Sequence, residues 1–168
     1  MLMHESAVLS LAGALRRRGW RISTAESCTG GLIAGACTGV AGSSDWFERG
    51  FVTYSNEAKV EMLGVAPALL AAHGAVSAEV ASAMAMGALQ HAPVQLAVAV
   101  TGIAGPGGAV PGKPVGTVCF ALALAIAHGP AGPGASVRSW SRLFSGDRAA
   151  VREATVAEAL RALTEAAA

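Results

Sequence analysis

The run Leu96-Ala97-Val98-Ala99-Val100 is continuously apolar, with no alternation between apolar and polar side chains. A strand with this pattern has to be covered on both faces, since either face would otherwise expose apolar side chains to water. The run therefore predicts the central strand of a sheet that is covered on both sides. It ends at Thr101, and residues 102–114 form a loop rich in glycine and proline. Loops that are too long to be simple connections are often functional.

Helical and extended patterns alternate along the rest of the chain, which indicates an α/β domain. Apolar periodicity, caps and glycine stops predict helices over residues 5–18, 30–40 and 56–63, a short one from Pro67, one after the cap Ser77 and a last one after Ser145-Gly146-Asp147. Asn56 is the predicted cap of the helix over residues 56–63.

Apolar and β-branched runs predict the remaining strands over residues 20–25, 51–54, 115–125 and 137–144. The last two strands are expected to pair antiparallel through a Gly/Pro turn at residues 129–134. A chain of 168 residues without a linker or an internal repeat is expected to form a single domain over residues 1–168.

Composition and charge exclude several classes of function. A net charge of +1 argues against binding to a nucleic-acid backbone, which needs a basic surface. The basic triplet Arg16-Arg17-Arg18 ends a predicted helix, where cations complement the helix dipole. The longest strongly apolar run, residues 115–127, is shorter than the roughly 20 residues that cross a bilayer, and the N-terminus lacks a signal-peptide pattern. We therefore expect a cytoplasmic protein that binds neither nucleic acid nor membrane.

The cysteines give no sign of a disulfide framework or a metal site. Cys28, Cys37 and Cys119 are odd in number and lack a C-x-x-C spacing. We expect reduced thiols, no metal and no cofactor.

The stretch Thr24-Ala25-Glu26-Ser27-Cys28-Thr29-Gly30-Gly31 connects a predicted strand to a predicted helix, and Ser27 is the candidate nucleophile in it. Backbone N–H groups near Gly30 and Gly31, at the start of the helix, are placed to bind an oxyanion or a phosphate. The alternative interpretation is structural, because Ser27 or Thr29 is also a suitable helix cap.

Cys28 is a second candidate nucleophile, because a thiol at a helix N-terminus is reactive when its pKa is lowered. Together with Glu26 and a lysine it would resemble a Cys-Glu-Lys amidase. A buried thiol without catalytic function is the alternative.

Further candidates follow other predicted strands. Tyr54 and Lys59 lie at the junction of strand 51–54 and the next helix, where a buried lysine can act as a general base and Tyr54 can share the proton transfer or orient the substrate. Thr101-Gly102 ends the central strand, in the position where open α/β sheets bind ligands. Arg148 or Arg142 is a candidate for binding an anionic group. For each of these residues a purely structural role, in the core or on the surface, is the alternative.

Motifs in a fixed order along nearly the whole chain resemble the C-terminal domain of the competence/damage-inducible protein CinA. These motifs are residues 25–31 (AESCTGG), 41–44 (AGSS) with the segment to Phe51, 53–59 (TYSNEAK), 73–77 (HGAVS), 101–106 (TGIAGP), 113–118 (KPVGTV) and 144–148 (FSGDR). Stand-alone members of this family are nicotinamide mononucleotide amidohydrolases. The resemblance implies a three-layer α/β/α sandwich with a mixed, mostly parallel sheet, and no metal.

The same resemblance implies a reaction and its residues. The carboxamide of nicotinamide mononucleotide would be hydrolysed to nicotinate mononucleotide and ammonia, with Ser27 as nucleophile and Lys59 or Tyr54 as base. The substrate-binding residues would be Thr29, Gly30, Gly31, Thr101, Gly102 and Arg148, the last preferred to Arg142 because its S-G-D-R motif is intact.

Two other functions remain as alternatives. One is a non-catalytic nucleotide-binding or regulatory module, and the other is hydrolysis of a different pyridine or nucleotide amide. A homo-oligomer is expected, because Trp140 and Phe144 suggest an apolar edge on a small domain rich in alanine and glycine.

Overall fold

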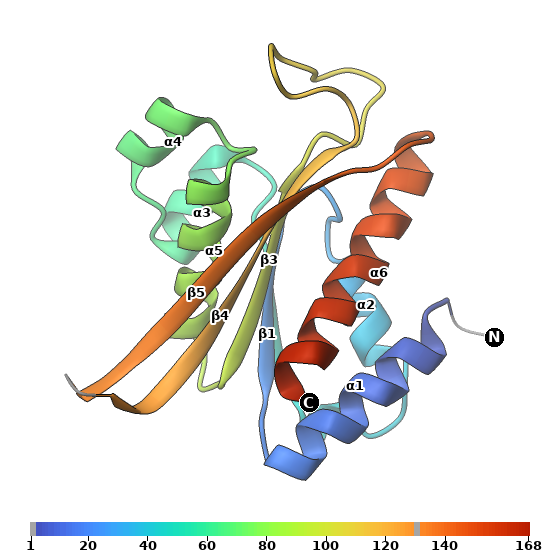
Figure 1. Cartoon of the computed structure of the whole chain (residues 1–168), viewed down its shortest axis with the longest axis vertical. Coiled ribbons are helices and arrows are strands. Elements are labelled where there is room, and N and C mark those ends of the chain that lie inside the picture. Colours follow the sequence, from blue (N-terminus) through green and yellow to red (C-terminus); the bar gives the residue numbers. More distant parts are fainter. Residues whose placement is uncertain (1–2, 130–131) are drawn as a thin grey trace.

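A computed structural model describes residues 3–129 and 132–168 and contains a five-stranded sheet (Figure 1). The strands are β1 Ile22–Glu26, β2 Phe47–Val52, β3 Leu96–Gly102, β4 Thr117–Gly129 and β5 Gly132–Leu143. They lie side by side in the order β2-β1-β3-β4-β5. The predicted apolar strand is β3, which is confirmed at the centre of the sheet.

The sheet is mixed, but the expectation that it is mostly parallel was wrong. β1 pairs parallel with β2 and with β3, whereas β3–β4 and β4–β5 are antiparallel pairs. The reason is the connection after β3, because residues 103–116 lead directly back into β4 and no crossover helix intervenes. The antiparallel pairing of the last two strands was predicted correctly.

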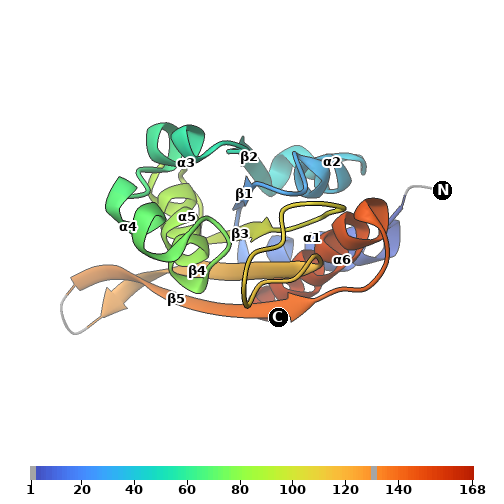
Figure 2. The same ribbon diagram turned by 90° about the horizontal axis from the view of Figure 1, so that it is seen from above.

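Helices cover both faces of the sheet (Figures 1 and 2). They are α1 Glu5–Arg18, α2 Leu32–Thr38, α3 Asn56–Leu63, α4 Pro67–His73, α5 Ala78–Gln90 and α6 Arg148–Ala167, with a 3-10 turn at Ser43–Asp45. One face carries α1, α2 and α6, and the other carries α5 with α3 and α4 outside it. The predicted α/β class with helices on the sheet is confirmed.

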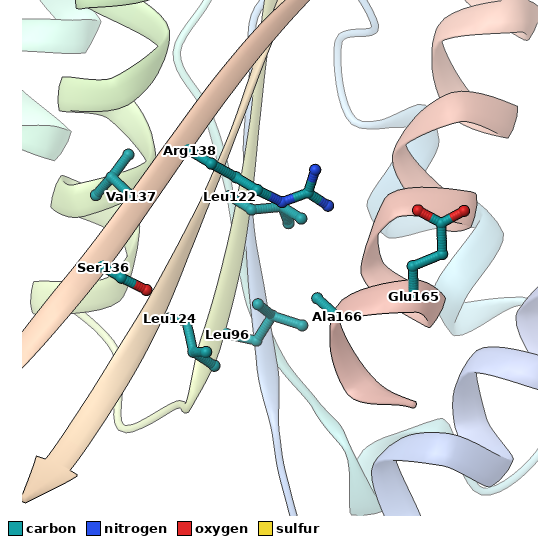
Figure 3. Close-up of a pocket in the computed structure, with 8 residues that line it drawn as sticks. All are labelled: Leu96, Leu122, Leu124, Ser136, Val137, Arg138, Glu165 and Ala166. Carbon is teal, nitrogen blue, oxygen red and sulfur yellow. The ribbon is translucent and has the colours of Figure 1, made fainter.

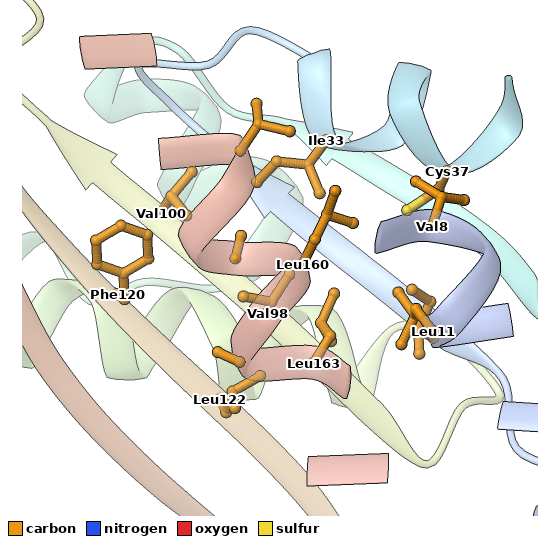
Figure 4. Packing of buried hydrophobic residues seen from close by; sticks show 14 of the residues in the cluster. Val8, Leu11, Ile33, Cys37, Val98, Val100, Phe120, Leu122, Leu160 and Leu163 are labelled. Atoms are coloured by element: carbon orange, nitrogen blue, oxygen red, sulfur yellow. The ribbon is translucent and has the colours of Figure 1, made fainter. Parts of the chain in front are cut away.

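The two faces differ in the size of their buried side chains. Leu96, Val98 and Val100 of β3 pack with α1 and α6 in the larger core cluster, part of which Figure 4 shows. Ala97 and Ala99 point to the other face, where small side chains allow α5 to lie close to the sheet. The high content of glycine and alanine thus serves close packing between elements.

Several boundaries differ from the predictions. The second strand is β2, Phe47–Val52, rather than residues 51–54, so Tyr54 lies beyond its end. An edge strand with one solvent-facing side, here containing Glu48, Arg49 and Gly50, shows little of the apolar pattern that identifies buried strands. The cap of α3 is Ser55, whose side chain accepts from the Ala58 N–H, and not Asn56.

The last two strands are longer than predicted. β4 runs from Thr117 to Gly129 instead of over residues 115–125, and β5 begins at Gly132 instead of residue 137. Strands that pair with each other in a hairpin extend past the part that the sheet buries, so apolar pattern alone does not define their ends. Of the predicted turn at residues 129–134, residues 130–131 lie outside the described residues.

The side chains proposed to make an apolar edge are packed instead. Trp140 stacks on Phe120 with ring centroids 5.3 Å apart, and Phe144 meets the same ring edge-on. Both are half-buried against the larger core cluster. An apolar edge at Trp140 and Phe144 therefore no longer supports the homo-oligomer, which stays a prediction.

Within residues 3–129 and 132–168, no helix combines the length and the apolar composition needed to cross a membrane.

Candidate active site

The carboxyl ends of β1, β2 and β3 meet at one edge of the sheet, where the parallel strands end together. A pocket of about 240 Å³ lies there. It is lined by Ser27, Cys28, Tyr54, Asn56, Lys59, Ala75, Val76, Thr101, Gly102, Ala104 and Arg148. Six residues predicted for the site, Ser27, Tyr54, Lys59, Thr101, Gly102 and Arg148, are thereby brought together.

Ser27 follows β1 directly, in a turn that its neighbours hold in place. Its N–H donates to the carbonyl of Val100 at 3.1 Å, and its carbonyl accepts from the Gly30 N–H at 3.0 Å. Gly30 and Gly31 have φ angles of +60° and +100°, a backbone conformation that favours glycine, and they turn the chain into α2. Ser27 is left nearly buried, and it lines the pocket.

The fully buried carboxylate of Glu26 occupies the N-terminus of α2. It accepts from the N–H groups of Ile33 and Ala34, both at 2.9 Å, and from the Thr29 hydroxyl at 2.6 Å. A carboxylate in this position satisfies N–H groups at the start of the helix that have no partner within it. The first turn of α2 is thus capped from inside the protein.

Three residues predicted to bind substrate are absent from the pocket lining: Thr29, Gly30 and Gly31. The Thr29 side chain is buried on Glu26, and the Gly30 N–H is engaged by the Ser27 carbonyl. The sequence pattern favoured ligand binding at the start of α2, because nothing in it indicates that the Glu26 carboxylate binds the N–H groups there.

Lys59 lies on α3 with its side chain only 1% exposed, and its Nζ is 3.0 Å from the Ser27 Oγ. Nζ also donates to the carbonyls of Thr53 at 3.0 Å and of Tyr54 and Ser55 at 3.4 Å each. Burial lowers the pKa of Lys59 below its usual 10.5, because an ammonium ion loses hydration there.

This arrangement satisfies both protonation states of the Lys59 amine. The ammonium form has three N–H groups, for which the carbonyls and the Ser27 hydroxyl are acceptors. The neutral amine has two N–H groups for the carbonyls and one lone pair, which can then accept the Ser27 hydroxyl proton. Such a pair can pass a proton in either direction.

Tyr54 lies at the rim of the pocket, with 59% of its surface exposed. Its hydroxyl accepts from Arg148 Nη2 at 2.9 Å, and Arg148 Nη1 donates to the Gly105 carbonyl at 2.8 Å. Arg148 therefore connects the start of α6 to the segment after β2 and to the glycine- and proline-rich loop after β3. The alternative arginine, Arg142, lies 3.1 Å from Glu158 and is not part of the lining.

Thr101 and Gly102 form the wall contributed by the end of β3. The Thr101 hydroxyl donates to the Ala75 carbonyl at 2.9 Å and so ties β3 to the segment before α5. Asn56, Ala75, Val76 and Ala104 also line the pocket, although none of them was predicted to be part of the site. They belong to motifs 53–59, 73–77 and 101–106, whose composition alone does not distinguish wall residues from core.

Cys28 also lines the pocket, but its environment opposes a thiolate. Burial raises the pKa of its thiol to about 11, and the nearby Glu26 carboxylate contributes to the rise. At neutral pH almost none of this thiol is ionised. The carboxylate of a Cys-Glu-Lys arrangement is moreover engaged by α2.

Another hollow, of about 360 Å³, lies at the other end of β3 (Figure 3). Its wall consists largely of aliphatic side chains from Leu96, Leu122, Leu124 and Ala166, with Arg138 and Glu165 at the border. This lining contains no lysine, histidine or cysteine beside its one serine, Ser136. Among the described residues, no three His, Cys, Asp or Glu side chains gather closely enough to hold a metal ion.

Comparison with known proteins gives consistent matches. The CinA C-terminal domain family model matches residues 4–167. A nicotinamide-nucleotide amidohydrolase PncC from Shigella flexneri is 54% identical over 89% of this chain and 86% of its own length. A CinA-like protein from Mycolicibacterium paratuberculosis is 54% identical over 86% of this chain, which corresponds to 32% of that longer protein.

Solved structures have the same fold. The crystal structure of competence/damage inducible protein CihA from Agrobacterium tumefaciens is 44% identical in sequence and superposes with a TM-score of 0.86. The match covers 98% of this chain and 96% of that one.

Proposed function

The chain belongs to the CinA C-terminal domain family, and on that premise we propose that it hydrolyses the carboxamide of nicotinamide mononucleotide to nicotinate mononucleotide and ammonia. The name of the Shigella flexneri relative supports the substrate. The observation that carries the chemistry is the buried contact of 3.0 Å between Ser27 Oγ and Lys59 Nζ. A serine needs an adjacent base to act as a nucleophile, and Lys59 is in hydrogen-bond reach.

In the first half of the proposed reaction, the neutral Lys59 amine accepts the Ser27 hydroxyl proton while Oγ bonds to the carboxamide carbon. The resulting tetrahedral intermediate carries a negative oxygen. When the C–N bond breaks, the Lys59 ammonium returns its proton to the leaving nitrogen, which departs as ammonia. Ser27 is then esterified with the nicotinate group, and Lys59 is neutral again.

The second half uses the same two side chains. Lys59 takes a proton from water, and the hydroxide oxygen bonds to the ester carbon. As the bond from carbon to Oγ breaks, the ammonium returns the proton to Ser27. Nicotinate mononucleotide leaves, and the starting state is restored.

The negative oxygen of each intermediate needs N–H donors. The Gly30 N–H is engaged by the Ser27 carbonyl, so we assign this role to other groups of the turn. The Cys28 N–H follows the nucleophile directly, and the Gly31 N–H lies at the start of α2. Neither of these N–H groups donates to a backbone carbonyl among the residues that the structure describes.

The size of the pocket suggests how the rest of the substrate binds. Its volume of about 240 Å³ is below the roughly 300 to 1,000 Å³ of typical ligand sites, so it suits the reacting ring better than a whole mononucleotide. The phosphate then lies toward the rim, where the Arg148 guanidinium can form charge-assisted hydrogen bonds to it. Thr101 and Gly102 contribute the wall at the end of β3.

Ammonia release from nicotinamide mononucleotide tests the proposal. Wild-type protein should release ammonia, Ser27→Ala and Lys59→Ala should lose most of the activity, and Cys28→Ala should keep it. Full activity in Ser27→Ala would reject the serine mechanism. Tight binding of the mononucleotide by wild-type protein without release of ammonia would instead indicate a non-catalytic nucleotide-binding module.

A further inference from the structure

Arg152 contacts the turn that contains the proposed nucleophile, although it is not part of the pocket lining. It lies on α6 four residues after Arg148, and so on the same side of the helix. The half-buried guanidinium donates from Nε to the Cys28 carbonyl and from Nη2 to the Thr29 carbonyl, each at 3.1 Å. Two successive peptide groups are thus held by one planar side chain.

Because each peptide group is planar, fixing these two carbonyls also fixes the direction of the N–H group of the following residue. In a trans peptide the C=O and the following N–H point in opposite directions. With the Thr29 carbonyl on Arg152, the Gly30 N–H faces away from it and donates to the Ser27 carbonyl at 3.0 Å. A chain of contacts therefore leads from Arg152 through the Thr29–Gly30 peptide to the backbone of Ser27.

The turn needs such a constraint because of its own composition. Gly30 and Gly31 both have positive φ angles, and glycine gives the backbone more freedom than any other residue. Glu26 fixes the turn where α2 begins, whereas Arg152 holds it from α6. The Arg152 charge also acts at this turn, since it opposes the rise that burial causes in the pKa of Cys28.

We propose that Arg152 is a positioning residue for the reaction, which holds the turn so that Ser27 Oγ stays within hydrogen-bond distance of Lys59 Nζ and the Cys28 N–H faces the pocket. The inference rests on the proposed serine mechanism. An arginine is required because a lysine offers a point charge and cannot hold two carbonyls in the fixed geometry of the guanidinium fork.

The test compares Arg152→Lys and Arg152→Met with wild type, and uses Arg161→Met as the matched control. Arg161 is on the same helix, but it pairs with Glu158 and Glu165 at the surface. For each protein, kcat and KM are measured with nicotinamide mononucleotide, and the melting temperature is recorded. The rate at which phenylmethanesulfonyl fluoride modifies Ser27 is measured separately. In that step Oγ bonds to sulfur, fluoride leaves, and Lys59 takes the proton.

Both Arg152 variants should lower kcat by about 10- to 100-fold, the size of effect expected from a displaced reacting group, with KM within about 3-fold of wild type. Sulfonylation of Ser27 should slow in parallel, and Arg161→Met should behave as wild type. If Arg152→Met fails to fold, Arg152→Lys, which keeps the charge and the aliphatic stem, decides by the same criteria.

Unchanged kcat and unchanged sulfonylation would overturn the inference. So would a raised KM with normal sulfonylation, because Arg152 would then bind substrate rather than position Ser27. If wild type does not hydrolyse nicotinamide mononucleotide, the proposed function fails, yet the sulfonylation rates still test Arg152. A wild-type Ser27 that is not sulfonylated at all also counts against the inference, since no activated serine would exist.

Discussion

Lys59 Nζ and Ser27 Oγ lie 3.0 Å apart, although 32 positions separate the two residues in the chain. The contact forms because parallel pairing of β1 with β2 places the ends of both strands at the same edge of the sheet. Lys59 lies on α3, the helix that follows β2, and its amine extends toward the end of β1. The carbonyls of residues 53–55 hold the amine there. Nucleophile and base are thus positioned by neighbouring strands.

Replacing Lys59 by methionine keeps an unbranched side chain that is one atom shorter, and removes the base. We expect kcat for ammonia release to fall by about 10²- to 10⁴-fold, the usual contribution of a general base. Circular dichroism and thermal melting should show a folded protein. Near wild-type turnover in a folded Lys59→Met variant would mean that another group takes the proton.

The variant Tyr54→Phe tests whether Lys59 or Tyr54 is the general base, a choice that the sequence did not decide. The change removes the hydroxyl that accepts from Arg148 and leaves the contact between Lys59 and Ser27 in place. We expect kcat to stay within about 5-fold of wild type, because a rim hydrogen bond contributes about 1 kcal/mol. A loss as large as that of Lys59→Met would show that the tyrosine transfers the proton.

The pH profile of kcat/KM should rise with pH through the pKa of Lys59. Burial places this pKa below 10.5, and only the neutral amine accepts the serine proton. The apparent pKa of the rising limb should therefore lie below 10.5, and the limb should be absent from the residual activity of Lys59→Met. A profile without a rising limb anywhere below pH 10.5 disagrees with this assignment.

Stability should depend on pH through the same group. Between the lowered pKa of folded Lys59 and the unfolded value near 10.5, the unfolded chain binds more protons, so the free energy of unfolding rises with pH. The contribution is complete above 10.5 and is lost as pH falls through the folded pKa. Urea unfolding of wild type and Lys59→Met at several pH values isolates this difference from the titration of the buried thiols.

Glu26→Gln should destabilise the nucleophile turn. The carboxylate accepts from two N–H groups and two hydroxyls, whereas an amide directs its own NH₂ toward one of those donors. We expect a loss of about 1–3 kcal/mol in the free energy of unfolding by urea. Glu61→Gln, on the exposed side of α3, is the control and should change stability by less than about 0.5 kcal/mol.

Long periodic elements were predictable from the sequence, because their patterns record burial directly. The helix over residues 5–18 is confirmed as α1, the apolar run is confirmed within β3, and Ser77 is confirmed as the cap of α5. The predicted cap segment Ser145-Gly146-Asp147 is confirmed before α6, with Asp147 as the capping residue. The edge strand β2 and the ends of the β4–β5 hairpin were misplaced, because most of their side chains are only half-buried or exposed. The proportion of parallel strands was wrong because it came from the resemblance rather than from the connections.

The site was only partly predictable, because its contacts depend on how distant elements are placed. Sequence indicated that Ser27, Lys59 and Thr101 follow or lie near strand ends, and the pocket brings them together. It did not indicate that Glu26 folds back onto α2 or that Arg152 reaches Cys28 and Thr29 from α6. The sequence offered Glu26 only as part of a Cys-Glu-Lys arrangement and gave no role to Arg152, because both contacts depend on how the helices pack.

The most direct test of the serine mechanism is the identity of the residue that carries the acyl group during turnover. Wild-type protein mixed with nicotinamide mononucleotide is quenched in acid within the first turnovers, digested and examined by mass spectrometry. We expect a nicotinate mononucleotide ester on Ser27, which disappears in Ser27→Ala together with ammonia release. An adduct on Cys28, or ammonia release at the wild-type rate by Ser27→Ala, would contradict it.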